Sequence, residues 1–333
     1  MSETSPLLEA QQKFVDAVPL RTTGKEDCPL EKALGRVLHD DIVAPTAMPP
    51  YHRAIVEGFL VHTAETAAAT ESGPKSFRIV GQVKPGDEQC PTFGSGEAVS
   101  VATGSIVSDG AFSVVRMWEA QREGDAFTIT RPFPPRFFIE DQGCDFAKGA
   151  TVLSAGTRLQ AADIGTIASL GISEIRAARR PGVTIFASGD EVIPYTDPLR
   201  PGAIRDSNSP MLAAAVSASG AIPTIAGIMS DDFDAFVSAV RTGLANSDMV
   251  VISGGTAVGG RDFISDLVRA CGDLLIDGVP MRSGRPLIMG MSQGKPLVCV
   301  AGHPPEALRG FRLFGAAAVN RLLGCETDLP ADD

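Results

Sequence analysis

The stretch Asp248-Met249-Val250-Val251-Ile252-Ser253-Gly254-Gly255-Thr256-Ala257-Val258-Gly259-Gly260-Arg261-Asp262 decides the fold of this chain. Its first half, from Met249 to Ser253, is mostly apolar and predicts a buried parallel strand. Its second half is a glycine-rich turn that leads into a helix beginning near Asp262. Glycines let the backbone approach a ligand closely, and a helix start offers unpaired N–H groups. The stretch therefore predicts an anion or phosphate site, in which the Asp262 carboxylate is placed to hold a divalent cation.

Two nucleotide-binding motifs come close to this stretch, but neither fits it. A dinucleotide loop needs glycine at its third position, and Ala257 stands there. A Walker loop needs Lys and then Ser or Thr after its second glycine, whereas Arg261 and Asp262 follow Gly260. We therefore exclude nicotinamide and P-loop nucleotide sites. A purely structural turn stays open, because strand, turn and helix occur in any doubly wound α/β unit.

Composition excludes several classes of function. The chain has 333 residues, of which 44% are hydrophobic, and this suffices for two or three domains with their own cores. No apolar run reaches the roughly 18 residues of a membrane span, and the N-terminus does not resemble a signal peptide. A net charge of −11 argues against nonspecific binding of nucleic acid or an anionic membrane. Six scattered cysteines without a Cys-x-x-Cys pair indicate free thiols in a cytoplasmic protein rather than a zinc or redox site.

The order of elements predicts three domains. A discontinuous linker domain covers residues 1–46 and 141–180 and includes a short helix over 29–38. Short strands with regular Gly and Pro predict a mostly-β domain at 47–140, inserted between the two linker pieces. Strands and helices then alternate over 181–325, which predicts a doubly wound α/β domain with a parallel sheet covered on both faces.

Ligands of such a sheet bind at the carboxyl ends of the strands, where the strand order reverses. Three polar or glycine-rich loops are expected there, at residues 188–191, 253–262 and 301–306. A further helix is expected from Asp231 to Leu244, with Ser230 as its N-cap.

These loops, in this order and spacing, resemble the molybdopterin-binding fold. The chain as a whole is similar to the molybdopterin molybdenumtransferase family, which inserts molybdate into adenylylated molybdopterin with loss of AMP. The matching motifs are Ser188-Gly189-Asp190-Glu191, Ile204-Arg205-Asp206-Ser207-Asn208, Gly227 to Asp232, Ser253-Gly254-Gly255 with Gly259 to Asp262, Ala102-Thr103-Gly104-Ser105 and Gly143-Cys144-Asp145. The resemblance implies the same three domains, a homodimer, and a molybdoenzyme or cofactor-biosynthesis protein as a further partner.

The resemblance also implies site residues. The catalytic carboxylates would be Asp145, Glu191, Asp231, Asp262 and Glu57. Mg²⁺ would be held by Glu191, Asp231 and Asp262, since carboxylates neutralise a pyrophosphate through such a metal. The anionic pterin substrate would be bound by Ser188, Gly189, Asp190, Asp206, Ser207, Asn208, Ser253, Gly254, Gly255, Thr256, Gly259, Arg282, Arg285, Gly302 and His303.

Simpler interpretations of single residues stay open beside these roles. Asp231 is also explained as a charge at a helix start, and Glu191 and Asp145 as solvated turn residues. His303 has the character of a loop histidine that binds nothing, and no histidine has the spacing of a zinc ligand.

Because the sequence departs from the family pattern at four places, more than one functional hypothesis stays open. Glu57 replaces an Asp, Arg282 and Arg285 replace lysines, Ala301 to Glu306 replaces Pro-Gly-Asn-Pro-x-Ser, and a small C-terminal β domain is expected to be absent after Leu323. The first hypothesis is the molybdenumtransferase itself, or a variant that uses tungstate or a modified cofactor. The second is a relative that binds molybdopterin or the mature cofactor as a carrier or assembly partner. A third, an adenylyltransferase, accounts only for the α/β domain.

Overall fold

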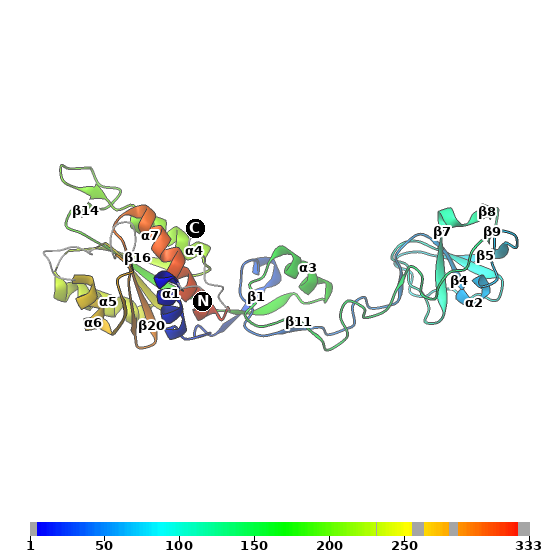
Figure 1. The fold of residues 1–333 in the computed structure, drawn as a ribbon, viewed down its shortest axis with the longest axis horizontal. Coiled ribbons are helices and arrows are strands. Elements are labelled where there is room, and N and C mark those ends of the chain that lie inside the picture. Colours follow the sequence, from blue (N-terminus) through cyan, green and yellow to red (C-terminus); the bar gives the residue numbers. More distant parts are fainter. Residues whose placement is uncertain (1–4, 231, 255–262, 280–285, 326–333) are drawn as a thin grey trace. The chain divides into compact units, whose positions relative to one another are not determined.

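The computed structural model describes residues 5–230, 232–254, 263–279 and 286–325. The chain forms two compact units, one made of residues 1–41 and 154–333 and the other of residues 42–153 (Figure 1). Each unit has its own hydrophobic core, so each can be described by itself.

A six-stranded mixed sheet forms the centre of the first unit, with the strand order β16-β13-β17-β20-β19-β18. The first four strands in this order are parallel, whereas β19 runs antiparallel to both of its neighbours. The α/β class is confirmed, but the expectation of a fully parallel sheet is wrong. The strands are β13 (Gly182–Ser188), β16 (Ile222–Met229), β17 (Met249–Ser253), β18 (Asp273–Asp277), β19 (Ile288–Ser292) and β20 (Lys295–Val300).

The reversal of β19 has a local cause. Only Gln293 and Gly294 separate β19 from β20, and their φ angles are 51° and 78°. A two-residue connection with two positive φ angles closes an antiparallel hairpin. A parallel pair would need a crossover of roughly a dozen residues or more.

Helices cover both faces of this sheet (Figure 1). Met249 and Val251 of β17 pack in one core with α1, α4 and the closing helices, and Val250 and Ile252 pack in the other core with α5 and α6. This alternation follows from the period of two of a strand. None of the described helices is long and apolar enough to cross a membrane. The helices are α1 (Pro6–Ala17), α4 (Asn208–Ala218), α5 (Phe233–Asn246), α6 (Phe263–Cys271), α7 (Pro304–Gly310), a π-helical turn (Phe311–Gly315) and α8 (Ala316–Leu323).

The start of α5 differs from the prediction. The Asp232 carboxylate accepts a hydrogen bond from the Ala235 N–H at 3.0 Å and is the N-cap of the helix. Ser230, predicted as the cap, instead lies just after β16. Both residue types favour this position, so the sequence pattern alone does not separate them.

The helix predicted at 29–38 is also absent. Its place is taken by β1 (Lys25–Pro29) and a 3₁₀ turn over Leu30–Lys32, and Gly35 then has a φ of 75°. Proline removes a backbone donor, and a left-handed glycine ends a helix rather than continuing it. β1 pairs antiparallel with β12 (Glu174–Ala178), and α3 (Ala161–Ser169) lies between β1 and β12 in the sequence.

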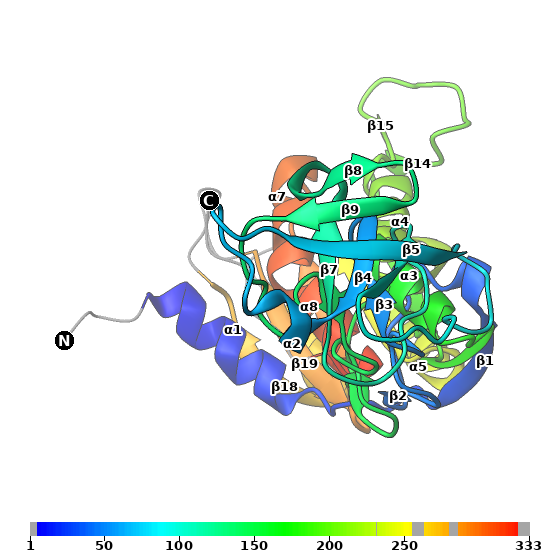
Figure 2. The ribbon, with the colours of Figure 1, turned by 90° about the vertical axis from the view of Figure 1, so that its right-hand side faces the viewer.

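The second unit is built on a six-stranded sheet with the order β7-β4-β6-β5-β9-β8. Figure 2 shows β5, β9 and β8 of this sheet side by side. Two clusters of buried side chains fill the unit, one around Phe59, Phe77 and Phe127 and the other around Leu60 and Val99. The elements are β4 (Gly58–His62), α2 (Thr63–Thr66), β5 (Lys75–Val83), β6 (Glu97–Val101), β7 (Phe112–Arg116), a 3₁₀ turn (Met117–Glu119), β8 (Gln121–Glu123) and β9 (Ala126–Ile129).

Two segments of the second unit run antiparallel beside each other. β2 (Ile42–Val43) pairs with β11 (Thr151–Leu153), and β3 (Arg53–Ala54) pairs with β10 (Ile139–Glu140). Backbone hydrogen bonds between Met48 and Phe146 join the segments between these pairs. The six cysteines of the chain are all free thiols.

Candidate functional site

The strand order of the first unit reverses at β13. From β13 the chain passes through a short flap, β14 (Val192–Ile193) and β15 (Ile204–Arg205), and through α4 to β16 on one side. It then passes through α5 to β17 on the other side of β13. Ser188 ends β13 and Ser253 ends β17, and these strands are neighbours in parallel register. This is the topological switch point at which ligands of open α/β sheets bind.

Asn208, the first residue of α4, connects two of the three loops that the sequence placed at this edge. Its side-chain amide nitrogen donates to Ser253 Oγ and to the Gly302 carbonyl oxygen, both at 2.7 Å. Ser253 Oγ in turn donates to the Ala301 carbonyl oxygen at 3.2 Å. Residues about 50 and 100 positions apart in the sequence therefore form one hydrogen-bonded cluster.

Two glycines allow the loops to pack closely here. Gly254 has a φ of 96°, and a Cβ on it would lie 2.5 Å from the Ser188 carbonyl oxygen. Gly189 has a φ of 138°, and a Cβ on it would lie within 2.9 Å of both carboxylate oxygens of Glu191. The Glu191 carboxylate therefore lies directly against the Gly189 backbone, at the end of β13.

Three buried polar atoms of the site lack a partner within the described ranges. They are Ser188 Oγ, Asn208 Oδ1 and Ser209 Oγ. Their residues are at most 9% exposed. Leaving a buried polar atom unpaired costs about 1–3 kcal/mol, so such atoms normally have a partner. Each therefore has hydrogen-bonding capacity that the described residues do not use.

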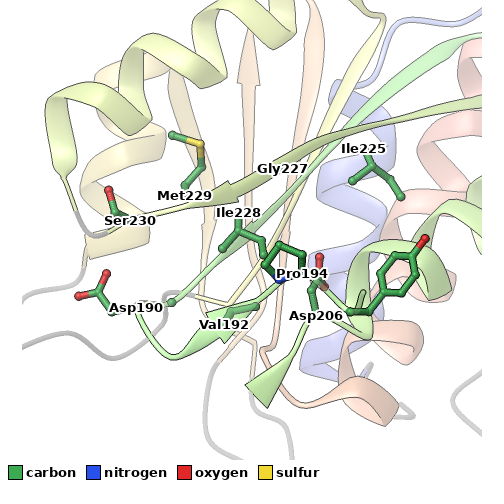
Figure 3. A pocket seen from close by; sticks show the side chains of 11 residues that line it. Asp190, Val192, Pro194, Asp206, Ile225, Gly227, Ile228, Met229 and Ser230 are labelled. Carbon is green, nitrogen blue, oxygen red and sulfur yellow. The ribbon is translucent and has the colours of Figure 1, made fainter. Parts of the chain in front are cut away.

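A cavity of about 510 Å³ opens beside this cluster, between the flap and β16 (Figure 3). In the figure, Asp190 and Ser230 lie at one end of it, and Asp206 lies beside Pro194 toward the other. Asp206 is 7% exposed, and its Oδ1 accepts from the Ser209 N–H at 2.9 Å. The lining residues are Gly189, Asp190, Val192, Pro194, Tyr195, Asp206, Ile225, Gly227, Ile228, Met229 and Ser230.

The other described residues predicted for the site are exposed. Ser207 precedes α4, and His303 precedes α7. Asp145 and Glu57 belong to the second unit, where Asp145 donates its N–H to the Met48 carbonyl oxygen and Glu57 directly precedes β4.

Several predicted site residues lie outside the described residues. Of the three predicted Mg²⁺ ligands only Glu191 is described, and its side chain is exposed. Within the described part of the chain, no three His, Cys, Asp or Glu side chains are grouped so as to hold a metal ion. The predicted residues outside it are Asp231, Gly255, Thr256, Gly259, Asp262, Arg282 and Arg285.

The sequence interpretation missed the apolar half of the cavity. Tyr195 is 60% exposed and Ile225 is 47% exposed, although both line the cavity. The sequence cue for Tyr195 is its proximity to the predicted loop, since it lies four residues after Glu191. β16 gave no comparable signal, since its apolar residues read as an ordinary strand core.

Comparisons with known proteins agree with this geometry. Residues 5–171 match the family described as "MoeA N-terminal region (domain I and II)", and residues 184–321 match "Probable molybdopterin binding domain". A molybdopterin molybdenumtransferase from Staphylococcus aureus is 29% identical over 323 residues, which cover 96% of this chain and 76% of the relative. One from Staphylococcus epidermidis is 28% identical, covering 90% of this chain and 72% of the relative. A crystal structure of the molybdopterin biosynthesis moeA protein from Pyrococcus horikoshii is similar with a TM-score of 0.82 at 28% identity, covering 97% of this chain and 80% of that chain.

Proposed function

Because this chain belongs to the MoeA family of molybdenum cofactor biosynthesis, we propose that it is a molybdopterin molybdenumtransferase. The reaction would insert molybdate into adenylylated molybdopterin and release AMP. The observation that carries this proposal is the cluster at the switch point, where Asn208 joins Ser253 to Gly302 beside buried polar atoms without a described partner.

The cluster suits an anionic substrate in its chemistry. Ser188 Oγ is a hydroxyl donor without a partner among the described residues, and the Gly254 backbone packs directly against Ser188, so the two loop starts are held together. Asn208 is held by two hydrogen bonds, so its Oδ1, which has no partner among the described residues, has a fixed direction. Groups fixed in this way orient a substrate without reorganising during the reaction.

We propose that Glu191 contributes a ligand to Mg²⁺, together with Asp231 and Asp262. The described carboxylate fits this role, because both of its oxygen atoms lie against Gly189, directly after the end of β13. Carboxylate oxygens are the protein ligands that Mg²⁺ prefers. When bound, the ion would neutralise charge between the pyrophosphate and the incoming molybdate.

A single-turnover assay tests the proposal. Purified protein is mixed with adenylylated molybdopterin, Mg²⁺ and molybdate, and AMP release is followed with and without molybdate. Release that depends on molybdate, and that stops after chelation of the metal, supports the transferase. Binding without release would instead make this protein a carrier of molybdopterin or of the mature cofactor.

A matched pair of variants ties the reaction to the cluster. Asn208→Ala removes the donors to Ser253 and Gly302, and AMP release should fall at least tenfold, in line with about 1.4 kcal/mol for a lost orienting contact. Asn246→Ala is the control, because Asn246 is an exposed asparagine at the end of α5 that bonds only Thr242 among the described residues. Equal loss in both variants would exclude a special role for Asn208.

We further propose that residues 1–46 and 141–180 form a linker domain through which two chains associate as a homodimer in the cytoplasm. The family resemblance and the three-domain order support this assignment. Sedimentation equilibrium at several protein concentrations tests it, since a single monomer mass would contradict it.

A further inference from the structure

We propose that His52 is a proton-dependent latch of the second unit. While its imidazole is neutral it holds the backbone of Gln142 and thereby the start of the segment 142–145, and it releases this backbone when the ring takes up a proton. All of these residues belong to the second unit. The latch itself does not depend on the proposed reaction. Only its consequence for turnover rests on the proposed function, because Asp145 is a site residue by family resemblance.

The segment 142–145 is tied mainly by backbone hydrogen bonds to the strand that runs beside it. The Gly143 N–H donates to the Pro49 carbonyl oxygen, and the Asp145 N–H donates to the Met48 carbonyl oxygen, both at 3.0 Å. Backbone donors and acceptors do not titrate in the physiological range. These two ties are therefore the same at every pH at which the unit is folded.

Gln142 is tied differently, through a side chain that can titrate. Its backbone N–H donates to Nδ1 of His52 at 3.0 Å, and its side-chain amide donates to the Pro50 carbonyl oxygen at 2.8 Å. Histidine is the one side chain whose ordinary charge change falls between about pH 5 and 8. The tie at Gln142 is therefore conditional on pH, whereas its neighbours are not.

The hydrogen-bond partners determine which ring nitrogen carries the proton of the neutral imidazole. Besides the Gln142 N–H, Nη2 of Arg136 lies 2.7 Å from Nδ1 of His52. A backbone N–H and a guanidinium can only donate, so Nδ1 must present its lone pair to both. The neutral ring therefore carries its proton on Nε2. The His52 side chain is 23% exposed, so a second proton can reach it from water.

Three charged side chains contact the ring in the part of the chain that the structure describes. Asp141 Oδ1 lies 3.2 Å from Nδ1, and Asp109 Oδ1 lies 3.6 Å from Nε2. Arg136 contacts Nδ1 and is also paired with Asp141. The guanidinium opposes a positive charge on the ring and the two carboxylates favour it. His52 therefore has hydrogen-bonding partners of both kinds, one set for the neutral ring and one for the charged ring.

Protonation exchanges one set of partners for the other. A proton on Nδ1 occupies the lone pair, so Gln142 and Arg136 lose their acceptor at the same time. The new Nδ1–H has Asp141 Oδ1 within reach, at 3.2 Å. A bond from His52 to Asp141 then replaces the bond from Gln142 to His52. Because Gln142 directly precedes Gly143, the segment that carries Asp145 loses its first tie.

Nitrogen-15 spectra of the imidazole rings test the assignment of the proton. The signals of His52 are those that disappear in His52→Asn. At about pH 8 its Nε2 should be protonated and its Nδ1 unprotonated, as the two donors require. A neutral ring with its proton on Nδ1 would overturn the inference, because that nitrogen could not accept from Gln142.

Amide hydrogen exchange, followed by NMR on the protein without substrate, tests the release. Between about pH 8 and about pH 5.5, the protection of the Gln142 N–H should fall about tenfold after correction for the intrinsic exchange rate, in line with one lost hydrogen bond. The Gly149 N–H is the internal control. It donates to the Ala44 carbonyl oxygen at 2.8 Å farther along the same two segments, and its protection should stay within about twofold.

Two variants separate the latch from a general effect of acid. His52→Asn places a carbonyl oxygen near the position of Nδ1 without a titratable group, so the Gln142 N–H should stay protected at both pH values. His52→Ala should leave this N–H unprotected at both. His39→Asn is the control, because His39 pairs with Asp40 in the other unit, and it should keep the pH response of the wild type.

A pH response of the Gln142 N–H that persists in His52→Asn would overturn the inference, as would full protection in His52→Ala at about pH 8. The wild type and His52→Asn suffice for the decision if His52→Ala does not fold. The exchange experiment also keeps the latch apart from the proposed function. Molybdate-dependent AMP release with no pH response at Gln142 would remove the latch alone, whereas the expected exchange pattern without AMP release would remove the transferase and leave the latch.

Discussion

A single methyl group added at Gly254 would disturb the close packing of its backbone against Ser188. We expect Gly254→Ala to lower the free energy of unfolding by about 2 kcal/mol or more, because its φ is 96° and the new Cβ would lie 2.5 Å from the Ser188 carbonyl oxygen. Gly165→Ala in α3 should have the opposite sign and stabilise by about 0.5–1 kcal/mol, since nothing lies within 4 Å of its Cβ position. Urea denaturation of both variants measures the difference. A neutral Gly254→Ala would show that the backbone there does not require glycine.

A second residue-scale prediction concerns Glu119 in the other unit. Hydrogen bonds from Arg116, at 2.8 Å, and from Arg131 lower the pKa of the Glu119 carboxyl from 4.5 to about 2. A lowered pKa in the folded state contributes stability that is present above pH 4.5 and is lost as the pH falls toward 2. Glu119→Gln should therefore be less stable than the wild type by roughly 1–3 kcal/mol at pH 7, and this difference should disappear near pH 2.

The chain offers a local probe for this measurement. Trp118 is its single tryptophan, and the Arg116 guanidinium lies 4.8 Å from the centre of its ring. Tryptophan fluorescence therefore reports unfolding next to Glu119. A difference between the two proteins that stays constant from pH 7 to pH 2 would contradict the assignment of the ion pair.

The sequence predicted the residue types of the site better than their contacts. The order of the motifs placed Ser188 and Ser253 at one edge of the sheet, where they end the neighbouring parallel strands β13 and β17. It did not predict that Asn208 would bridge Ser253 and Gly302, because a choice among hydrogen-bond partners depends on three-dimensional distances. Tyr195 was missed for the same reason, since a tyrosine in a polar loop has no pattern that separates a cavity wall from a solvated side chain.

At the scale of elements, the N-cap of α5 can be tested directly. Asp232→Ala removes the acceptor of the Ala235 N–H and should destabilise the protein by about 1 kcal/mol, whereas Asp232→Asn should retain most of the stability. Asp234→Ala is the control, because Asp234 lies in the first turn and contributes only its charge, about 0.3–1 kcal/mol. Thermal unfolding of the three variants gives the ranking. A larger loss in Asp234→Ala than in Asp232→Ala would exclude Asp232 as the cap.

The sequence predicted an element correctly where its pattern of apolar residues matches the burial of those residues in the structure. β17 has apolar residues on both faces, and both faces are covered by helices, so its sequence and its burial coincide. The direction of β19 was not predicted, because Gln293-Gly294 is not among the usual two-residue hairpin pairs. The helix predicted over 29–38 is wrong, because its hydrophobic pattern is helical but other features prevent a helix there. Gly35 has a left-handed backbone conformation, and β1, which ends at Pro29, pairs with β12.

At the scale of the whole molecule, the net charge of −11 opposes an anionic substrate. Raising KCl from about 20 to 200 mM shortens the screening length from roughly 20 Å to roughly 7 Å, so kcat/KM for adenylylated molybdopterin should rise, by roughly two- to fivefold, at constant Mg²⁺. Binding of uncharged 6-hydroxymethylpterin should not change. A fall in kcat/KM with salt would mean that local cations dominate the field at the site. A rise confined to the anionic substrate would instead show that the anion is captured by short-range hydrogen bonds and metal against the field of the protein.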